Sequence, residues 1–290
     1  MNNNRVLSGS VSIAWEEYKK WILNPRMILV VILGIIMNDS IIKPLLERVD
    51  KMGEPINLIE PFIAMGNSGT FILFLSIVYL VLMADFPRVD GNTSFIMIRT
   101  GRTAWFLGQI LFAMMSAVTY LVLLFLETMV LCSSKAYLYN GWSLVATDYD
   151  LRYKDAVGSK VSELLPANLY NQMSPYKTAV LTGILTILYF LLLDMMMLLF
   201  YSMKCKKMGF VLSVSLIALG SAFCATKTAA MWLFPMAHSI VWVHFDKFYR
   251  DEIVKIGWSI LYFIILIGIL FMVVYRGMKH LNFTSVEETD

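Results

Sequence analysis

Long apolar runs constrain this chain more than any other feature of its sequence. The six runs fall at residues 27–42, 69–84, 104–131, 178–202, 208–225 and 254–275. Most have about the 17–25 residues that cross roughly 30 Å of hydrocarbon. The chain is 58 % hydrophobic and 16 % charged, whereas soluble domains carry about 25 % charge. The predicted fold class is an all-α, polytopic membrane protein whose six transmembrane helices form a single transmembrane domain.

A short amphipathic segment precedes the first run. Between residues 11 and 23, apolar positions follow the i, i+4, i+7 spacing of one helix face, and charged residues occupy the opposite face. The apolar positions are Val11, Trp15, Tyr18 and Ile22, and the charged positions are Glu16, Glu17, Lys19 and Lys20. This pattern is typical of a helix in the membrane interface. Asn24-Pro25 is expected to end it, because a proline displaces the preceding residue from the α region.

Polar segments separate the runs and differ strongly in length. Residues 85–103 form a short loop between the second and third runs, whereas residues 43–68, 132–177 and 226–253 form longer connections. The last of these contains an apolar stretch that is too short to cross a bilayer and is interrupted by Pro235. This combination predicts a re-entrant hairpin before the last span.

Lysine and arginine residues near the ends of the runs predict the orientation. If the N-terminus is cytoplasmic, the segments on that side carry a net positive charge, whereas those on the other side are close to neutral. The cluster Lys204, Lys206 and Lys207 is the strongest single contribution. The sequence therefore predicts a multi-pass membrane protein with both termini in the cytoplasm. Residues 85–103 are then a cytoplasmic loop, and the three longer connections lie outside.

Composition and spacing disfavour several classes of protein. The formal net charge of +3 and the lack of long basic runs give no indication of nucleic-acid binding. The three cysteines show no CxxC spacing. His238, His244 and Asp246 fit neither HExxH nor a helical i, i+4 pair, so no metal site is expected. Arrangements of Ser/His/Asp or Cys/His in a catalytic context are also missing, and we expect no enzymatic centre.

Two acidic residues inside apolar runs are candidates for a transport path. Asp194 lies well inside the fourth run, where a carboxylate costs about 2.5–3.5 kcal/mol on insertion scales. It is either a transport or proton-relay residue or a structural hydrogen-bond partner of a neighbouring span. Glu127 lies near the outer end of the third run. It is either part of the transport path or a solvated or capping group at the membrane surface.

The loop at residues 85–103 carries the most specific pattern. Its order is Asp85, the turn Asp90-Gly91-Asn92, the apolar cluster Phe95-Ile96-Met97-Ile98, then Arg99, Gly101 and Arg102 before Trp105. A short amphipathic helix of this kind can insert its apolar face into the groove of a partner protein. The arginines can pair with acidic residues at the rim of that groove or with lipid phosphate.

With this loop, an interfacial N-terminal helix, six spans and a hairpin before the last span, the chain resembles the membrane subunits of type-2 ATP-binding-cassette (ABC) exporters. In that family such a loop is the coupling helix that leads into the third span. The resemblance implies a permease that forms a homo- or heterodimer above separate ABC ATPase subunits, which bind ATP and Mg²⁺. The chain itself has no GxxxxGK[ST] phosphate loop. The residues assigned to ATPase docking are Thr93, Phe95, Ile96, Ile98, Arg99 and Arg102.

Two other classes are compatible with the same sequence. An ion-coupled secondary transporter would use Asp194, although no internal repeat is visible. A non-transporting membrane protein, for example an immunity or sensory subunit, would bind a peptide with its outer loops. No motif identifies the cargo, and a peptide, a lipid, a drug and an ion all fit the chain.

Overall fold

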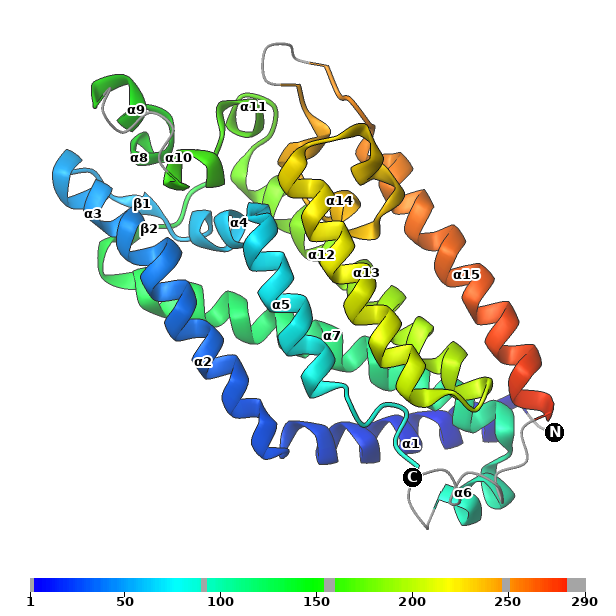
Figure 1. Cartoon of the computed structure of the whole chain (residues 1–290). Coiled ribbons are helices and arrows are strands. Elements are labelled where there is room, and N and C mark those ends of the chain that lie inside the picture. Colours follow the sequence, from blue (N-terminus) through cyan, green and yellow to red (C-terminus); the bar gives the residue numbers. More distant parts are fainter. Residues whose placement is uncertain (1–2, 90–92, 154–159, 247–250, 281–290) are drawn as a thin grey trace.

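Long helices form an extended bundle in the computed structural model, which describes residues 3–89, 93–153, 160–246 and 251–280 (Figure 1). The long helices are α1 (Asn3–Ile22), α2 (Ile28–Met37), α5 (Gly69–Leu82), α7 (Arg102–Cys132), α12 (Pro175–Ser202), α13 (Lys206–Thr226) and α15 (Ile256–His280). The short helical segments are η1 (Pro25–Met27), η2 (Asn38–Ile42), α3 (Lys43–Met52), α4 (Glu60–Asn67), α6 (Thr93–Thr100), η3 (Ser133–Lys135), α8 (Leu144–Thr147), α9 (Tyr149–Arg152), α10 (Lys160–Leu164), α11 (Ala167–Tyr170), η5 (Ala229–Leu233), α14 (Pro235–Ser239) and η6 (Trp242–His244). Strands β1 (Ile56–Asn57) and β2 (Ala136–Tyr137) pair in parallel.

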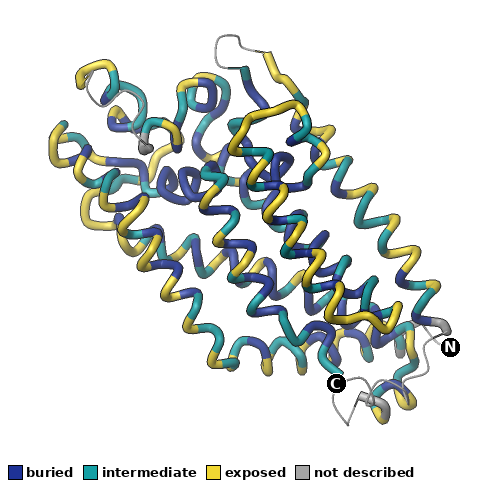
Figure 2. Tube along the Cα trace, viewed as in Figure 1, coloured by how far each residue is buried: buried dark blue, intermediate teal, exposed yellow. Residues whose placement is uncertain are grey.

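Five helical segments within the described residues are long and apolar enough to cross a membrane. They are Pro25–Met52, Arg102–Lys135, Pro175–Ser202, Lys206–Thr226 and Ile256–Met278. A sixth crossing results if α4 and α5, which meet at 86°, are counted as one broken span. Exposed apolar side chains along α2, α13 and α15 give these helices a surface suited to lipid (Figure 2). The chain is therefore an all-α protein with several helices that can span a membrane.

The first span extends beyond its apolar run. The sequence predicts an end at Lys43-Pro44, but the helix continues through η2 and α3 to Met52. The π-helical turn η2 directly precedes α3, whose second residue is Pro44, and the missing N–H of this proline would interrupt a regular α-helical ladder. Asp39 also pairs with Lys43 across this turn. Residues 43–68 are accordingly largely helical, in α3 and α4, and are not the loop that their polarity predicts.

The helices α7 and α12 form the centre of the bundle. α12 packs against α7, α13 and α15, and α7 also packs along α1. Tyr79 of α5 stacks on Phe190 of α12 with 4.4 Å between ring centroids. Tyr120 of α7 lies 5.5 Å from the Tyr79 ring. These buried rings join three helices at one point.

The helix α1 lies across one end of the bundle (Figure 1). It begins earlier than the amphipathic pattern predicts, and it ends just before the Asn24-Pro25 pair. At the contact with α7, a Cβ atom on Gly108 would lie 2.9 Å from Ile13 Cγ2. Trp15 is exposed whereas Trp21 is buried, so the aromatic residues of α1 divide between the surface and the contact with α7.

The two ends of the bundle carry different elements. α6, the start of α1, the end of α15 and the turn between α12 and α13 lie at one end, which we call the α6 end (Figure 1). α3, α4, α8 to α11 and both strands lie at the other end (Figure 1). We call these elements the distal cap. The arrangement places the start of α1 and the end of α15 on the same side as α6.

Candidate functional site

The short helix α6 presents an exposed apolar face at the α6 end. Phe95 and Ile98 are 72 % and 84 % exposed, and Arg99 beside them is exposed as well. Met97, on the opposite side, is buried against the core. Phe95, Ile98 and Arg99 follow the i, i+3, i+4 spacing of one helix face. We call these three residues the α6 face.

The other residues assigned to docking have different surroundings. Ile96 is half-buried and packs against the core, so it supports α6 from behind. Arg102 is exposed in the first turn of α7. Thr93 begins α6, but its side chain lies outside the described residues. The structure thus brings three of the six residues together on one exposed surface.

Gly101 connects α6 to α7 through a sharp turn. Its φ of 90° lies in a region that residues with a side chain rarely adopt. Its N–H donates to the Met97 carbonyl at 2.8 Å, and Trp105 N–H donates to the Gly101 carbonyl at 3.2 Å. The Trp105 side chain is buried. α6 and α7 are therefore joined through a single residue with a backbone hydrogen bond on each side of it.

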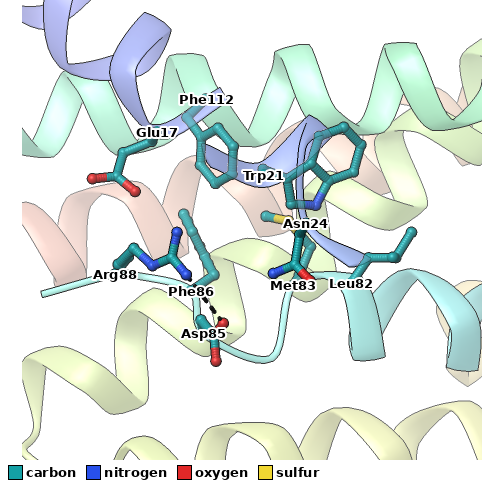
Figure 3. A pocket seen from close by; sticks show the side chains of 9 residues that line it. All are labelled: Glu17, Trp21, Asn24, Leu82, Met83, Asp85, Phe86, Arg88 and Phe112. Carbon is teal, nitrogen blue, oxygen red and sulfur yellow. Dashed lines mark ion pairs between the residues drawn. The ribbon is translucent and has the colours of Figure 1, made fainter. Parts of the chain in front are cut away.

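Asp85 fixes the segment before α6 to two other parts of the chain. Arg26 Nη1 donates to its carboxylate at 2.9 Å, and Arg88 Nη2 lies 3.6 Å from the same oxygen (Figure 3). Lys206, at the start of α13, donates to the main-chain carbonyls of Asp85 and Pro87. A shallow pocket beside Asp85 is lined by Glu17, Trp21, Asn24, Leu82, Met83, Phe86, Arg88 and Phe112 (Figure 3). These bonds connect the loop to η1, which leads into α2, and to α13.

Asp194 is completely buried where α5, α7 and α12 meet. Tyr79 of α5 donates its hydroxyl to Asp194 Oδ2 at 2.6 Å, and the same hydroxyl lies 3.4 Å from Ser116 Oγ of α7. Asp194 Oδ1 has no hydrogen-bond partner among the described residues. The hydrogen bond from Tyr79 fits the interpretation of Asp194 as a structural hydrogen-bond partner of a neighbouring span. The unpartnered oxygen is the atom that a transport role would use.

Glu127 lies elsewhere in the bundle, on the side of α7 that faces α2. Its carboxylate rests against the backbone of Gly34, since a Cβ atom there would lie 2.7 Å from Glu127 Oε2. That oxygen is shielded from solvent and has no hydrogen-bond partner in the described part of the chain. Glu127 lines a groove between α2 and α7, and Asp194 is not among the lining residues. The two candidate transport residues therefore belong to separate sites.

His238 and His244 both contact the hydroxyl of Ser259 on α15. His238 Nδ1 and His244 Nε2 lie 2.7 and 2.8 Å from Ser259 Oγ. His238 Nε2 contacts the Trp232 carbonyl at 2.9 Å, and His244 Nδ1 contacts the Ile240 carbonyl at 2.9 Å. Among the described residues, no group of three or more His, Cys, Asp or Glu could hold a metal ion. The histidines instead join residues 229–244 to α15.

Acid is expected to weaken this contact. Burial lowers the pKa of both imidazoles, that of His244 to about 4, whereas an unfolded histidine titrates near 6.5. Between these values the unfolded chain binds a proton that folded His244 does not, so stability falls as the pH drops from about 6.5 towards 4, by up to about 3 kcal/mol. Thermal midpoints in detergent at pH 7 and pH 5 measure this loss. A His244→Gln variant with the same pH dependence as the wild type would contradict it.

The distal cap contains a buried polar network that sequence reasoning missed. Glu60 is fully buried, and its carboxylate accepts hydrogen bonds from the Ser143 N–H and hydroxyl, each at 2.6 Å. Asn57 donates to the main-chain carbonyls of Tyr139 and Gly141. The Glu60-Pro61 pair is a sequence signal for a helix N-terminus. That signal does not identify Ser143, which lies 83 residues further along the chain.

No family model, no curated protein and no solved structure matches this chain. The class that the helices define is an all-α membrane protein. Any narrower assignment depends on the surfaces described above.

Proposed function

We propose that this protein is the permease subunit of an ATP-driven exporter of the type-2 ABC class. The observation that carries the proposal is the α6 face, an exposed apolar pair with an adjacent arginine on a short helix. Exposed apolar residues clustered away from the long, lipid-suited helices point to a protein partner. The proposed partner is a separate ABC ATPase subunit that binds ATP and Mg²⁺. The permease itself has no enzymatic activity in this proposal.

The contacts around α6 suggest how the partner would drive the spans. When the ATPase subunits close, they displace α6. The Gly101 turn passes this movement to α7, and the bonds of Asp85 to Arg26 and Lys206 pass it to α2 and α13. Three helices on different sides of the bundle would thus respond to one displacement, which is what a change between inward- and outward-facing states requires.

The proposal includes a specific topology. α4 and α5 form one broken span, which gives six spans in total. α1 lies in the interface, and residues 229–244 form a re-entrant hairpin before α15. The distribution of lysine and arginine supports cytoplasmic N- and C-termini and a cytoplasmic position of α6. The plasma-membrane location is part of the exporter assignment. The functional unit is a homo- or heterodimer of permeases.

Copurification of the ATPase tests the proposal. The wild-type protein, isolated from its natural membranes in mild detergent, is expected to bring an ATPase with it. The double variant Phe95→Asp, Ile98→Asp is expected to retain about a tenth of that ATPase or less, because it places charges in a desolvated apolar contact. The measurement is the ratio of ATPase to permease in the purified fraction.

A matched control uses an exposed apolar residue at the other end of the molecule. Leu138 is 61 % exposed beside the distal cap, and Leu138→Asp is expected to keep the wild-type amount of ATPase. Equal loss in both variants would indicate general misfolding. If no ATPase accompanies the wild type, the exporter proposal is wrong.

Ion-coupled secondary transport is the second candidate, and Asp194 Oδ1 is the observation that favours it. This oxygen is buried and has no hydrogen-bond partner among the described residues, as expected of a site that binds and releases a proton or cation. Uptake or release driven by an ion gradient in vesicles without any ATPase would support this function over the first.

A further inference from the structure

The groove between α2 and α7 is apolar apart from two polar side chains in its half towards the distal cap. These are Asn38 and Glu127, with Val130 and Leu131 beyond Glu127 on α7, whereas Met27, Val30 and Leu123 line the other half. Met27 and Asn38 are eleven positions apart in the sequence, which corresponds to about 16 Å along a helix. The groove encloses about 1030 Å³ of empty space, including its open side. Its length and its division of polarity match a molecule with one polar head and one apolar tail.

The half of the groove towards the distal cap carries a single acidic side chain. Glu127 is the one acidic or basic residue among those that line it. Its Oε2 atom is shielded from solvent and lacks a hydrogen-bond partner within the described residues. A buried carboxylate oxygen without a partner is costly. A bound cation that reaches the carboxylate from the groove would supply a counter-charge, and an N–H donor on it would add a charge-assisted hydrogen bond.

Gly34 makes room for this carboxylate. Glu127 Oε2 lies 2.7 Å from the position that a Cβ atom on Gly34 would occupy, so any side chain at residue 34 would require the Glu127 carboxylate to move. An alanine at this position would displace the Glu127 carboxylate from its contact with the α2 backbone. The position of the carboxylate therefore depends on Glu127 of α7 and Gly34 of α2. This dependence distinguishes the proposed site from an acidic residue on an open surface.

We propose that this groove binds a cationic amphiphile, with a protonated primary amine at Glu127 and the tail along Val30 and Leu123. The further step of identifying such amphiphiles as the exported cargo rests on the proposed function. Binding in the groove does not require an ATPase. The position of Glu127 near the outer end of α7 places the amine where headgroups of the outer leaflet lie. The tail then points towards the membrane centre.

Charge complementarity selects this occupant over two others. The tail of a neutral lipid would fill the apolar part and leave the Glu127 carboxylate without a counter-charge. A quaternary ammonium would supply the charge but no N–H donor, so it should bind more weakly than a primary amine. The expected order of affinity is dodecylammonium, then dodecyltrimethylammonium, then dodecanol.

Equilibrium binding of radiolabelled dodecylammonium to the full-length protein in phosphatidylcholine nanodiscs tests the proposal, with empty nanodiscs as background. Glu127→Gln keeps the shape of the side chain but removes its charge, and it is expected to raise the Kd about ten- to a hundredfold. Gly34→Ala should also raise the Kd, because it displaces the carboxylate. The matched control is Glu47→Gln, which removes an exposed acid of α3 outside the groove and should leave the Kd unchanged.

Three results would overturn the proposal. Unchanged affinity in Glu127→Gln would show that the carboxylate is not used. Equal binding of dodecanol by the wild type would show that the groove holds only an alkyl chain. If dodecylammonium does not bind and Glu127→Gln changes the oligomeric state, a second copy of the chain occupies the groove.

The proposed function can fail independently of this inference. Specific dodecylammonium binding without any associated ATPase would retain the amphiphile site and reject the ABC exporter. An associated ATPase that depends on the α6 face, together with no binding at Glu127, would retain the exporter and reject this cargo class.

Discussion

Replacing Gly66 by alanine is expected to lower the thermal midpoint of the purified protein by about 5 °C. A Cβ atom on Gly66 of α4 would lie 2.2 Å from Thr182 Cγ2 of α12. Thr182 is fully buried, and its β-branched side chain has few alternative rotamers. Overpacking of this kind costs about 1–3 kcal/mol, which outweighs the roughly 1 kcal/mol that alanine gains over glycine in a helix. The conversion to temperature uses about 2–4 °C per kcal/mol.

A second substitution and a second glycine make this expectation specific. Thr182→Ser removes the methyl group that causes the clash, so the double variant Gly66→Ala, Thr182→Ser should recover most of the lost midpoint. A Cβ atom on Gly268 of α15 would meet no atom of a neighbouring described element within 4 Å, so Gly268→Ala should not be destabilising. The midpoint is measured by intrinsic fluorescence in detergent. Equal midpoints for Gly66→Ala and the wild type would show that α4 moves freely away from α12.

Asp194→Ala is expected to destabilise the protein by about 2 kcal/mol, whereas Asp194→Asn should cost less than about 1 kcal/mol. Alanine leaves the buried Tyr79 hydroxyl without its 2.6 Å acceptor, and it also leaves a cavity. Asparagine retains a carbonyl oxygen that can accept the same bond. Thermal unfolding of both variants in detergent measures the difference.

The Tyr79 partnership can be isolated by a double-mutant cycle. Tyr79→Phe removes the donor, and the Tyr79→Phe, Asp194→Ala double variant should be more stable than the two single effects predict, by about 1 kcal/mol. Independent effects would argue against the bond.

ATP hydrolysis by the purified complex then separates the two roles of Asp194. If Asp194→Asn folds and hydrolyses ATP at the wild-type rate, its role is structural. If it folds but loses the coupled activity, the carboxylate itself is needed.

The helical, membrane-embedded character of the chain could be predicted because it is a local property. A run of apolar residues long enough to cross a bilayer has few stable alternatives, since its backbone must be hydrogen-bonded within the segment. The end of α1 was predictable for a similar reason, because Asn24 and Pro25 act within a few residues. Asn24 indeed caps η1 by accepting a hydrogen bond from the Arg26 N–H.

Predictions from polarity alone were less reliable at the ends of the spans. Asn38, Asp39 and Lys43 look like the end of a membrane helix, but they continue the first span through a π-helical turn. Polarity indicates where a helix leaves the hydrocarbon, and it does not indicate where the helix ends. The described parts of residues 132–177, expected as a connection with one helix-like piece near residues 155–165, contain the four short helices α8 to α11 of the distal cap.

The sequence by itself determined that the chain folds into membrane helices and that a short amphipathic segment at 93–98 lies between two of them, because both follow from residue order over a few turns. Only the tertiary structure decided which side chains meet. It paired Tyr79 with Asp194 and Glu60 with Ser143, and it placed Glu127 against Gly34. The rotation of each helix about its axis is set by packing against several neighbours at once. That rotation turned Phe95 and Ile98 outward and Ile96 towards the core.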